Sequence, residues 1–289
     1  MSLRINTNVA ALNAYNNLAT NQAAQASAFE QLSSGLRINT AADDAAGLSI
    51  SQGLTSQING MTQAVSNAQD GINVAQIADG ALGTVQNILQ RMRTLAVQSA
   101  NGGSQDAASQ TAAQSEVKNL ATELDKISAQ TSFGGNALLN GGLAVGTTGA
   151  GATSSLTFQV GANAGDTIQL SLKSTDANTL GVDANAGTPQ IDLSTTAGAS
   201  SAITTIDTAI AAVSAERSTI GATQNQLNYT VSNLQTAVTN VTASRSNLTD
   251  ADLASEVTKM TQSQILTQAA TSVLAQANSA PQAILKLLQ

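Results

Sequence analysis

The chain has 289 residues and a net charge of −7 at pH 7, yet only 10% of its residues are charged and 2% aromatic. It has no His and no Cys, which excludes Ser–His–Asp and Cys–His catalysis, zinc sites and redox cysteines. The sequence has no cluster of Lys and Arg residues that would bind nucleic acid, and no apolar run approaches the roughly 20 residues of a membrane span. We expect no enzyme, cofactor or metal site, no nucleic-acid partner and no membrane insertion. With so few aromatics, thin helical packing is a better expectation than a spherical core.

The first predicted element is a helix within residues 3–36. Its apolar stripe is thin and is interrupted by Ala, Gln and Asn. This N-terminus lacks the apolar core and small-residue cleavage site of a secretory signal, so we expect no export by that route. The apolar positions are Leu3, Ile5, Val9, Leu12, Tyr15, Leu18, Phe29, Leu32 and Leu36.

Two further helices are predicted before the middle of the chain. An apolar seam with helical spacing runs from Ile50 to Ala96, and a shorter one runs from Val117 to Ile127. "NGGSQD" at 101–106 separates them with a Gly pair and with Ser104, a candidate N-cap. Three such seams, including the one described below, indicate a bundle of helices packed along their lengths, whereas a compact globule would need shorter helices and more large apolar residues.

The period then changes to two, which predicts a β-hairpin. "SLTFQV" and "TIQLSL" alternate apolar and polar residues, and "GANAGD" between them supplies the turn. The flanking segments are rich in Gly, Ser and Thr and are expected to be loops. Residues 173–199 have no room for a separate domain, so we expect a short surface connection there.

The clearest periodicity lies between residues 203 and 241. Its apolar positions step by alternating threes and fours and skip only Arg217 and Gln224, which is the a/d seam of a coiled coil. The seam comprises Ile203, Ile206, Ile210, Val213, Ile220, Leu227, Val231, Leu234, Val238 and Val241.

The last predicted helix begins within "DADLASE" at 250–256, a run that lacks the Gly and the spacing of an EF-hand loop. Asp250 is its candidate N-cap, with Asp252 in the first turn, and Pro281 is a candidate kink. The chain finishes on an apolar tip of Ile284, Leu285, Leu287 and Leu288. The fold class is therefore mainly α: a long coiled-coil helical bundle with paired N- and C-terminal helices, plus a small β-hairpin region.

The two terminal segments are too thinly apolar to fold alone. Ordering the backbone costs about 1–2 kcal/mol per residue, whereas burial returns about 25 cal/mol per Å² of apolar surface. We expect both ends to be disordered in the free monomer and to fold when they bury against each other and against neighbouring copies.

Several ordered blocks of the sequence resemble bacterial flagellin. The N-terminal blocks are "INTNVAALNAYNNL" (5–18), "LSSGLRINTAADDAAGLSIS" (32–51), "QDGINVAQIADGAL" (69–82) and "LQRMRTLAVQSANG" (89–102). They are followed by "SEVKNLATELDKISAQTSFGGNALLNG" (115–141), "FQVGANAGDTIQL" (158–170), "IGATQNQL" (220–227) and "SRSNLTDADLASEVTKMTQSQILTQAATSVLAQANSAPQAILKLL" (244–288). The resemblance covers nearly the whole chain in the family's order.

The resemblance implies an organisation into domains. Residues 1–42 and 248–289 would form an inner core coiled coil on the lumen side of a filament. Residues 43–172 and 200–247 would form an outer helical bundle, with the hairpin at about 155–172. Residues 173–199 would stand where larger members carry variable outer domains. The segment Ser33–Gly47 is a candidate compliant connector, the alternative being a solvated loop without a mechanical role.

The resemblance also implies a function and partners. The chain would be a structural subunit of the flagellar filament for swimming motility, exported unfolded through the flagellar type III apparatus and located outside the cell. Its partners would be other copies of itself, the flagellar cap and hook–filament junction proteins, and an export chaperone that grips the C-terminus. The alternative is that the chain is itself a hook–filament junction protein, whose family matches poorly through the "QRMRTLAVQ" and "FQVGANAG" blocks.

Two groups of candidate site residues follow. Arg91, Leu95 and Glu116 fall on positions that a host Toll-like receptor recognises in many flagellins, although Thr94 departs from the acidic residue common at its place. The second group would form the subunit interface of the inner core. It comprises Leu3, Ile5, Val9, Leu12, Tyr15, Phe29, Leu253, Val257, Met260, Ile265, Leu266, Leu274, Ile284, Leu285, Leu287 and Leu288.

Overall fold

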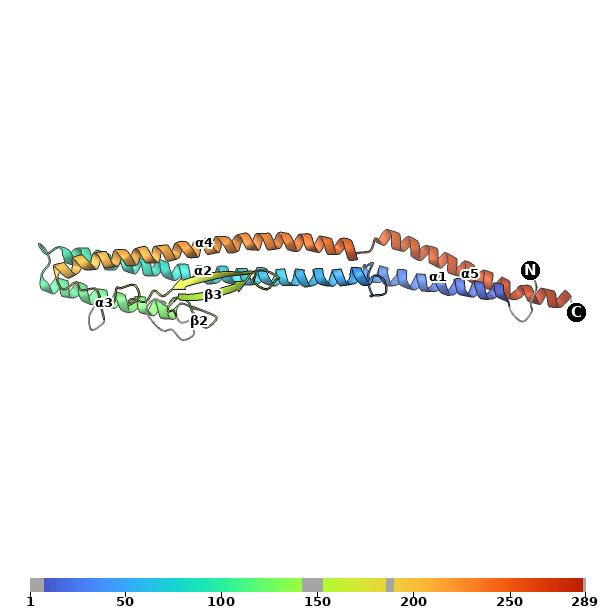
Figure 1. Cartoon of the computed structure of the whole chain (residues 1–289), viewed down its shortest axis with the longest axis horizontal. Coiled ribbons are helices and arrows are strands. Elements are labelled where there is room, and N and C mark those ends of the chain that lie inside the picture. The colour runs from blue at the N-terminus through green and yellow to red at the C-terminus, as the bar shows by residue number, and fades with distance from the viewer. Residues whose placement is uncertain (1–7, 142–152, 186–189, 288–289) are drawn as a thin grey trace. The chain divides into compact units, whose positions relative to one another are not determined.

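The structure is a computed structural model that describes residues 8–141, 153–185 and 190–287 (Figure 1). These residues form five α-helices: α1 (Val9–Ser34), α2 (Ala45–Ala100), α3 (Ala107–Gln130), α4 (Thr196–Thr249) and α5 (Leu253–Leu287). Two antiparallel strand pairs lie between α3 and α4: β1 (Ser132–Phe133) with β2 (Asn136–Ala137), and β3 (Thr153–Gln159) with β4 (Thr167–Lys173). The predicted mainly α fold with a small β-hairpin region is confirmed.

The chain divides into two compact units. The terminal unit contains residues 1–58 and 239–289, and the central unit contains residues 59–238. Helices α2 and α4 contribute residues to both units, so the boundaries fall inside helices rather than at the expected positions 42/43 and 247/248. The roles assigned to an inner and an outer domain remain predictions.

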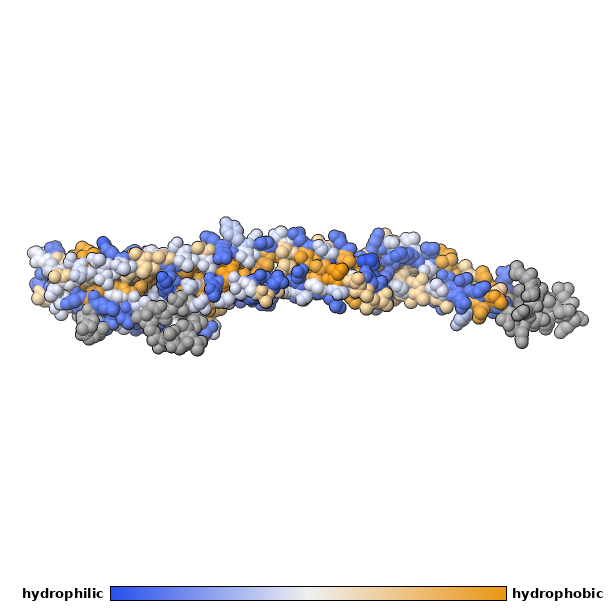
Figure 2. Space-filling view, in the orientation of Figure 1, coloured by the Kyte–Doolittle hydropathy of each residue, from blue (hydrophilic) through white to orange (hydrophobic). Residues whose placement is uncertain are grey.

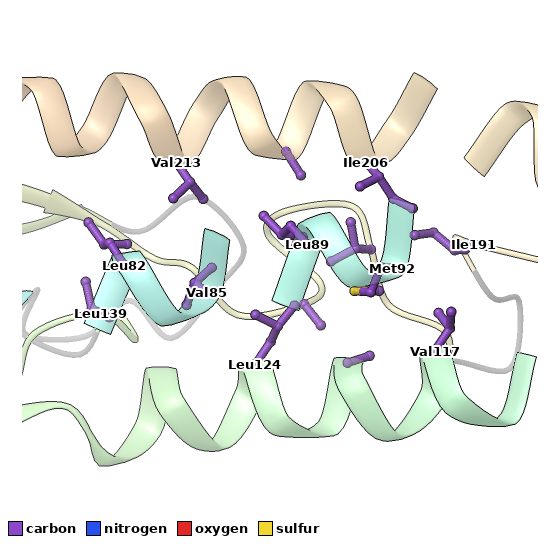
Figure 3. Close-up of a cluster of buried hydrophobic side chains, with 14 of the residues drawn as sticks. Leu82, Val85, Leu89, Met92, Val117, Leu124, Leu139, Ile191, Ile206 and Val213 are labelled. Carbon is purple, nitrogen blue, oxygen red and sulfur yellow. The ribbon is translucent and has the colours of Figure 1, made fainter. Parts of the chain in front are cut away.

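The central unit has a continuous apolar core. Side chains of α2 lie between α4 on one side and α3 on the other, with Leu89 and Met92 fully enclosed (Figure 3). Many core positions on these helices are Ala, whose small side chain lets neighbouring helices approach closely. The chain therefore builds a dry core with almost no aromatic residues.

The burial pattern of α4 corrects one stripe of the predicted coiled coil. Ile206, Val213, Ile220 and Leu227 are buried seven residues apart, as the heptad required. The second stripe is shifted by one residue: Ala202, Ala209, Glu216 and Thr223 are buried, whereas Ile203 and Ile210 are only partly buried. A helix covered by several partners buries a face wider than a two-helix seam, so small and polar residues beside the apolar stripe are also enclosed.

The skipped heptad position Arg217 has a specific partner on α2. Its guanidinium donates to Asp79 at 2.7 Å and to the Gln86 side-chain oxygen at 2.7 Å. The hydrogen bond with Asp79 raises the pKa of Arg217. A second α2–α4 pair joins Arg93 to Asp207 at 2.6 Å. Because these side chains are partly exposed, we assign them to fixing the register of the two helices rather than to large stabilisation.

The predicted hairpin is confirmed with its expected facing. Leu156 pairs with Leu170 and Phe158 with Ile168 across the two strands. Ile168, Leu170 and Leu172 are buried, while the residues between them are exposed. The hairpin lies close to α2, where a Cβ on Gly71 would lie 3.2 Å from the Phe158 ring. A glycine there allows the aromatic ring to rest against the helix backbone.

Residues 173–199 were expected to be a surface connection, and their packing corrects that expectation. Ala177, Val182, Ala184, Ile191 and Leu193 are at most 1% exposed and belong to the central core. Side chains of α3 hold this segment, because Asp125 accepts from the amide of Ala177 at 2.9 Å. In this segment the apolar residues are mixed irregularly with Gly, Asp and Thr. Because the sequence shows no helical or strand period there, it does not predict that the segment contributes to the core.

Asp125 gives this packing a pH dependence. Burial first, then the charges of Asp176 and Asp183, raises the pKa of Asp125 above its usual value, although the amide of Ala177 acts in the opposite sense. A raised pKa means that ionised Asp125 destabilises the folded chain above that pKa and that acidification relieves the effect. Asp125→Asn keeps an oxygen acceptor, so we expect a higher urea midpoint than wild type at pH 7, with a difference that shrinks as pH falls.

The matched control is Glu123→Gln, since Glu123 lies on the same helix with its side chain 52% exposed beside Lys126. It should give no gain at pH 7. An Asp125→Asn chain no more stable than wild type at neutral pH would contradict this interpretation of the carboxyl group.

Two predicted helix caps are each two residues away from their expected positions. Asp106, not Ser104, caps α3 by accepting from the amide of Ser109 at 2.8 Å. Asp252, not Asp250, caps α5 by accepting from the amide of Ala254 at 3.0 Å. In both cases a carboxylate at the N-terminus of the helix also interacts favourably with the helix dipole. Helix α5 continues through Pro281.

Candidate assembly surface

Helices α1 and α5 lie side by side in the terminal unit and run in opposite directions (Figure 1). Asn8 begins the pairing: its side-chain oxygen caps α1 by accepting from Ala11 N at 3.1 Å, and its Nδ2 donates to the carbonyl of Ala277 at 2.7 Å. The buried residues of α1 are Ala14 and Ala28. The predicted pairing of terminal helices is therefore present, but it encloses little apolar surface.

The terminal unit leaves its large apolar side chains uncovered. Of the buried apolar residues in the described part of the chain, only Ala14, Ala28 and Ile38 belong to this unit. Phe29 is 66% exposed and Ile265 is 61% exposed. Figure 2 shows apolar surface patches over these helices. The exposed set on the terminal unit is Val9, Leu12, Tyr15, Phe29, Leu36, Ile50, Leu253, Val257, Ile265, Leu266 and Val273.

Two shallow grooves follow these exposed residues. One, of about 430 Å³, runs along α5 between Val257 and Leu266 with Ile265 and two threonines in its wall. The other, of about 270 Å³, lies where Phe29 of α1 approaches Met260 of α5, with glutamines around it. Both are lined by apolar and uncharged polar side chains, a surface that another helix of the same composition would fit.

The predicted interface residues thus fall into three groups. On α1, Val9, Leu12, Tyr15 and Phe29 are exposed; on α5, Leu253, Val257, Ile265 and Leu266 are exposed, while Met260 and Leu274 are partly buried. The side chains of Leu3, Ile5, Ile284, Leu285, Leu287 and Leu288 lie outside the described residues. Three exposed residues were missing from the predicted set: Leu36, Ile50 and Val273. The sequence places these three residues in apolar stripes, but it does not predict which residues of a stripe are exposed to solvent.

The segments that join α1 to α2 and α4 to α5 are tied together, and we call residues 35–44 with 248–252 the paired joint. The amide of Arg37 donates to Thr249 O at 2.7 Å, and the amide of Ala251 donates to Gly35 O at 3.0 Å. Leu36 and Asp250 form a short antiparallel bridge. Gly35 ends α1 with a φ of 71°, a conformation that favours glycine. The two connections therefore form one hydrogen-bonded element rather than two free loops.

The three predicted receptor residues lie in the central unit but not on one surface. Arg91 and Glu116 form an ion pair of 2.7 Å with side chains 52% and 43% exposed. Leu95 is 3% exposed and belongs to the core. A direct receptor contact through Leu95 would need a change in the packing of the core, whereas Arg91 and Glu116 are already accessible. The receptor role of these three residues stays a prediction.

These features define a class of protein: a helical structural chain with a well-packed central unit and a terminal helix pair whose apolar face is uncovered. In the part of the chain that the structure describes, no helix combines the length and apolar character needed to cross a membrane.

Comparison with known proteins identifies the family. Residues 5–143 match the bacterial flagellin N-terminal helical region, and residues 203–288 match the bacterial flagellin C-terminal helical region. Flagellin of Bacillus subtilis is 42% identical over 304 residues, covering 99% of this chain and 100% of the relative. The flagellar filament 33 kDa core protein of Treponema phagedenis is 39% identical over 285 residues, covering 99% of each. The crystal structure of Bacillus cereus flagellin is 32% identical, with a TM-score of 0.48 over 58% of this chain and 88% of that one.

The chain belongs to the bacterial flagellin family. It is a structural subunit of the flagellar filament, and nothing in these comparisons favours the hook–filament junction alternative.

Proposed function

We propose that this flagellin polymerises by coupling subunit association to the folding of its two terminal helices. The observation that supports the proposal is the uneven distribution of apolar residues. Among the described side chains of the terminal unit, eleven large apolar ones are exposed, and the buried apolar ones are two alanines and Ile38. In a filament, neighbouring copies would cover these side chains, and identical contacts that do not close into a ring would extend as an open helix.

The energetics support coupled folding rather than docking of preformed helices. Ordering α1 and α5 costs about 1–2 kcal/mol per residue. The alanines buried between them return little, at about 25 cal/mol per Å² of apolar surface. Covering Phe29, Ile265 and the other exposed side chains supplies the missing burial. The terminal helices of one chain would therefore be stable only against those of the next.

The family further supports a route to the filament and a set of partners. The chain would leave the cell unfolded through the flagellar type III apparatus and would act outside it, without catalytic activity. An export chaperone would bind the apolar C-terminus, and cap and hook–filament junction proteins would contact the growing and the basal ends. A host Toll-like receptor would contact the surface around Arg91 and Glu116. Each of these partners is part of the proposal.

Limited proteolysis of monomer and polymer tests the coupling. In the monomer we expect rapid cleavage within about the first forty and last forty residues, and in the polymer we expect both ends to be protected, because a protease needs locally unfolded chain. The central unit should resist cleavage in both states and serves as the internal control. Terminal segments that resist digestion in the monomer would contradict coupled folding and would leave the family assignment intact.

We also propose that the paired joint is a constrained element, and that Gly47, in the first turn of α2 directly after it, is the position most sensitive to added volume. Asp44 caps α2 by accepting from Gly47 N at 2.8 Å, and a Cβ at residue 47 would meet Asp44 and would lie 2.7 Å from Ile38 Cδ1. Gly47→Ala should lower the thermal stability of assembled filaments by about 1–3 kcal/mol per subunit, because an overpacked site must shift its neighbours.

Gly53→Ala is the matched control, since it is the same substitution in the same helix and a Cβ there would meet nothing within 4 Å. It should be neutral or stabilising by up to about 1 kcal/mol through helix propensity. Filaments of Gly47→Ala should therefore melt at a lower temperature than filaments of Gly53→Ala. If Gly47→Ala filaments melt no earlier than Gly53→Ala filaments, the joint is not a constrained element.

A further inference from the structure

A cavity of about 330 Å³ opens in the central unit between the segment after β4 and helix α4. Leu180, Ala212 and Val213 form apolar walls, and Thr175, Thr179 and Glu216 supply polar groups. Its volume is at the lower end of the range for small-molecule pockets. All of these residues belong to the central unit, so the cavity is independent of the assembly surface.

The polar groups in this cavity are incompletely paired. The hydroxyl of Thr175 is buried and has no hydrogen-bond partner within the described structure. The hydroxyl of Thr179 is also buried, but it lies beside the Asp176 carboxylate, whose pKa it helps to lower. Thr175 is 2% exposed and Glu216 is 7% exposed. Buried hydroxyls normally have partners, and leaving one unpaired costs about 1–3 kcal/mol. The Thr175 hydroxyl is therefore available to accept a hydrogen bond from a ligand in the cavity.

Glu216 adds a charge that lacks a counter-ion. Its Oε1 accepts from the amide of Lys173 at 3.1 Å, and none of the ion pairs in the described residues includes it. Lys173 also borders the cavity, but its side chain is exposed to solvent. Burying a carboxylate without a cation is costly, so a cationic ligand would stabilise this position.

We propose that this cavity binds a small primary ammonium compound with an apolar stem. A primary ammonium has three N–H donors, and the cavity offers three acceptor groups: the Glu216 carboxylate and the hydroxyl oxygens of Thr175 and Thr179. The walls of Leu180, Ala212 and Val213 would enclose the stem. A neutral alcohol of the same length would lack the charge that Glu216 requires, and an anion would be repelled.

Calorimetric titration of the monomer with n-pentylammonium chloride tests the proposal. We expect saturable binding with a Kd of about 1 mM, the range open to a ligand of this size. n-Pentanol is the neutral control and should bind at least tenfold more weakly. Glu216→Gln keeps the acceptor for Lys173 N and should weaken pentylammonium at least tenfold without changing pentanol binding. Thr175→Val should weaken it by a smaller factor.

Two further variants separate binding from folding. Val213→Phe should fill the cavity and abolish binding of both ligands, and far-UV circular dichroism checks that each variant keeps its helices. Lys173→Met removes a competing cation from the rim and should tighten pentylammonium binding. Equal affinity for pentylammonium and pentanol, no loss in Glu216→Gln, or no saturable binding would overturn the proposal, the last result leaving a cavity filled by water.

Discussion

Replacing Ile265 with Asp is expected to stop filament growth while the central unit stays folded. Ile265 is 61% exposed in the single chain and borders the groove along α5, so in the polymer it would become buried against a neighbouring copy. Removing a carboxylate from water without a partner costs several kcal/mol, and every subunit would bear that cost. Because each 1.4 kcal/mol is a factor of ten, the critical concentration should rise by more than about 100-fold.

The measurement is light scattering of the variant seeded with wild-type filament fragments. Ile265→Leu is the matched control, because it keeps the apolar volume and should polymerise at nearly the wild-type concentration. Circular dichroism of both monomers should be the same, since the side chain is already exposed before assembly. An Ile265→Asp chain that grows at the wild-type critical concentration would show that this face of α5 is not covered in the filament.

Much of the fold was predictable from periodicity, because the apolar spacing of long helices is repeated many times. The helices around Leu82, Leu124 and Ile220 follow from apolar residues spaced three or four apart, and the hairpin of β3 and β4 follows from apolar residues spaced two apart. The exact caps did not follow. Ser104 and Asp106 are both good N-cap residues, and only the geometry of the turn selects between them.

The shifted stripe on α4 has a different cause. The sequence shows which residues are apolar but not how many neighbours surround a helix. Ala209 and Glu216 are buried because α2 and the segment after β4 cover α4 together, and that segment carries no repeating pattern of its own. Which residues beside the apolar stripe of α4 are buried therefore depends on tertiary packing and cannot be predicted from the local period.

The candidate assembly surface was predictable in position but not in detail. Composition alone indicated that the terminal helices could not bury themselves, and the exposure of Leu12, Phe29 and Ile265 agrees with that reasoning. The backbone hydrogen bonds from Ala251 N to Gly35 O and from Arg37 N to Thr249 O could not be foreseen, because they join residues more than two hundred positions apart through groups that every sequence possesses. Long-range backbone contacts leave no trace in side-chain patterns.

The contrast between the two units has a consequence for where mutations act. Exposed side chains of the terminal unit would make their contacts only with neighbouring subunits. A substitution of one of them should therefore impair filament assembly rather than folding of the monomer. A substitution in the central core removes contacts that the monomer already has, so its effect should appear in folding stability. Leu89 is the position where the second expectation is largest.

Leu89→Ala should lower the free energy of unfolding of the monomer by about 2–5 kcal/mol, the range for truncating a fully buried leucine. The Leu89 side chain is 0% exposed and lies between α3 and α4, where its loss would leave a cavity lined by rigid helices (Figure 3). Urea unfolding followed by circular dichroism should show a lower midpoint with an unchanged slope. Val97→Ala is the control on the same helix, because Val97 is 47% exposed and its truncation should cost less than about 1 kcal/mol. Equal midpoints for the two variants would mean that the core around Leu89 is not packed as the structure has it.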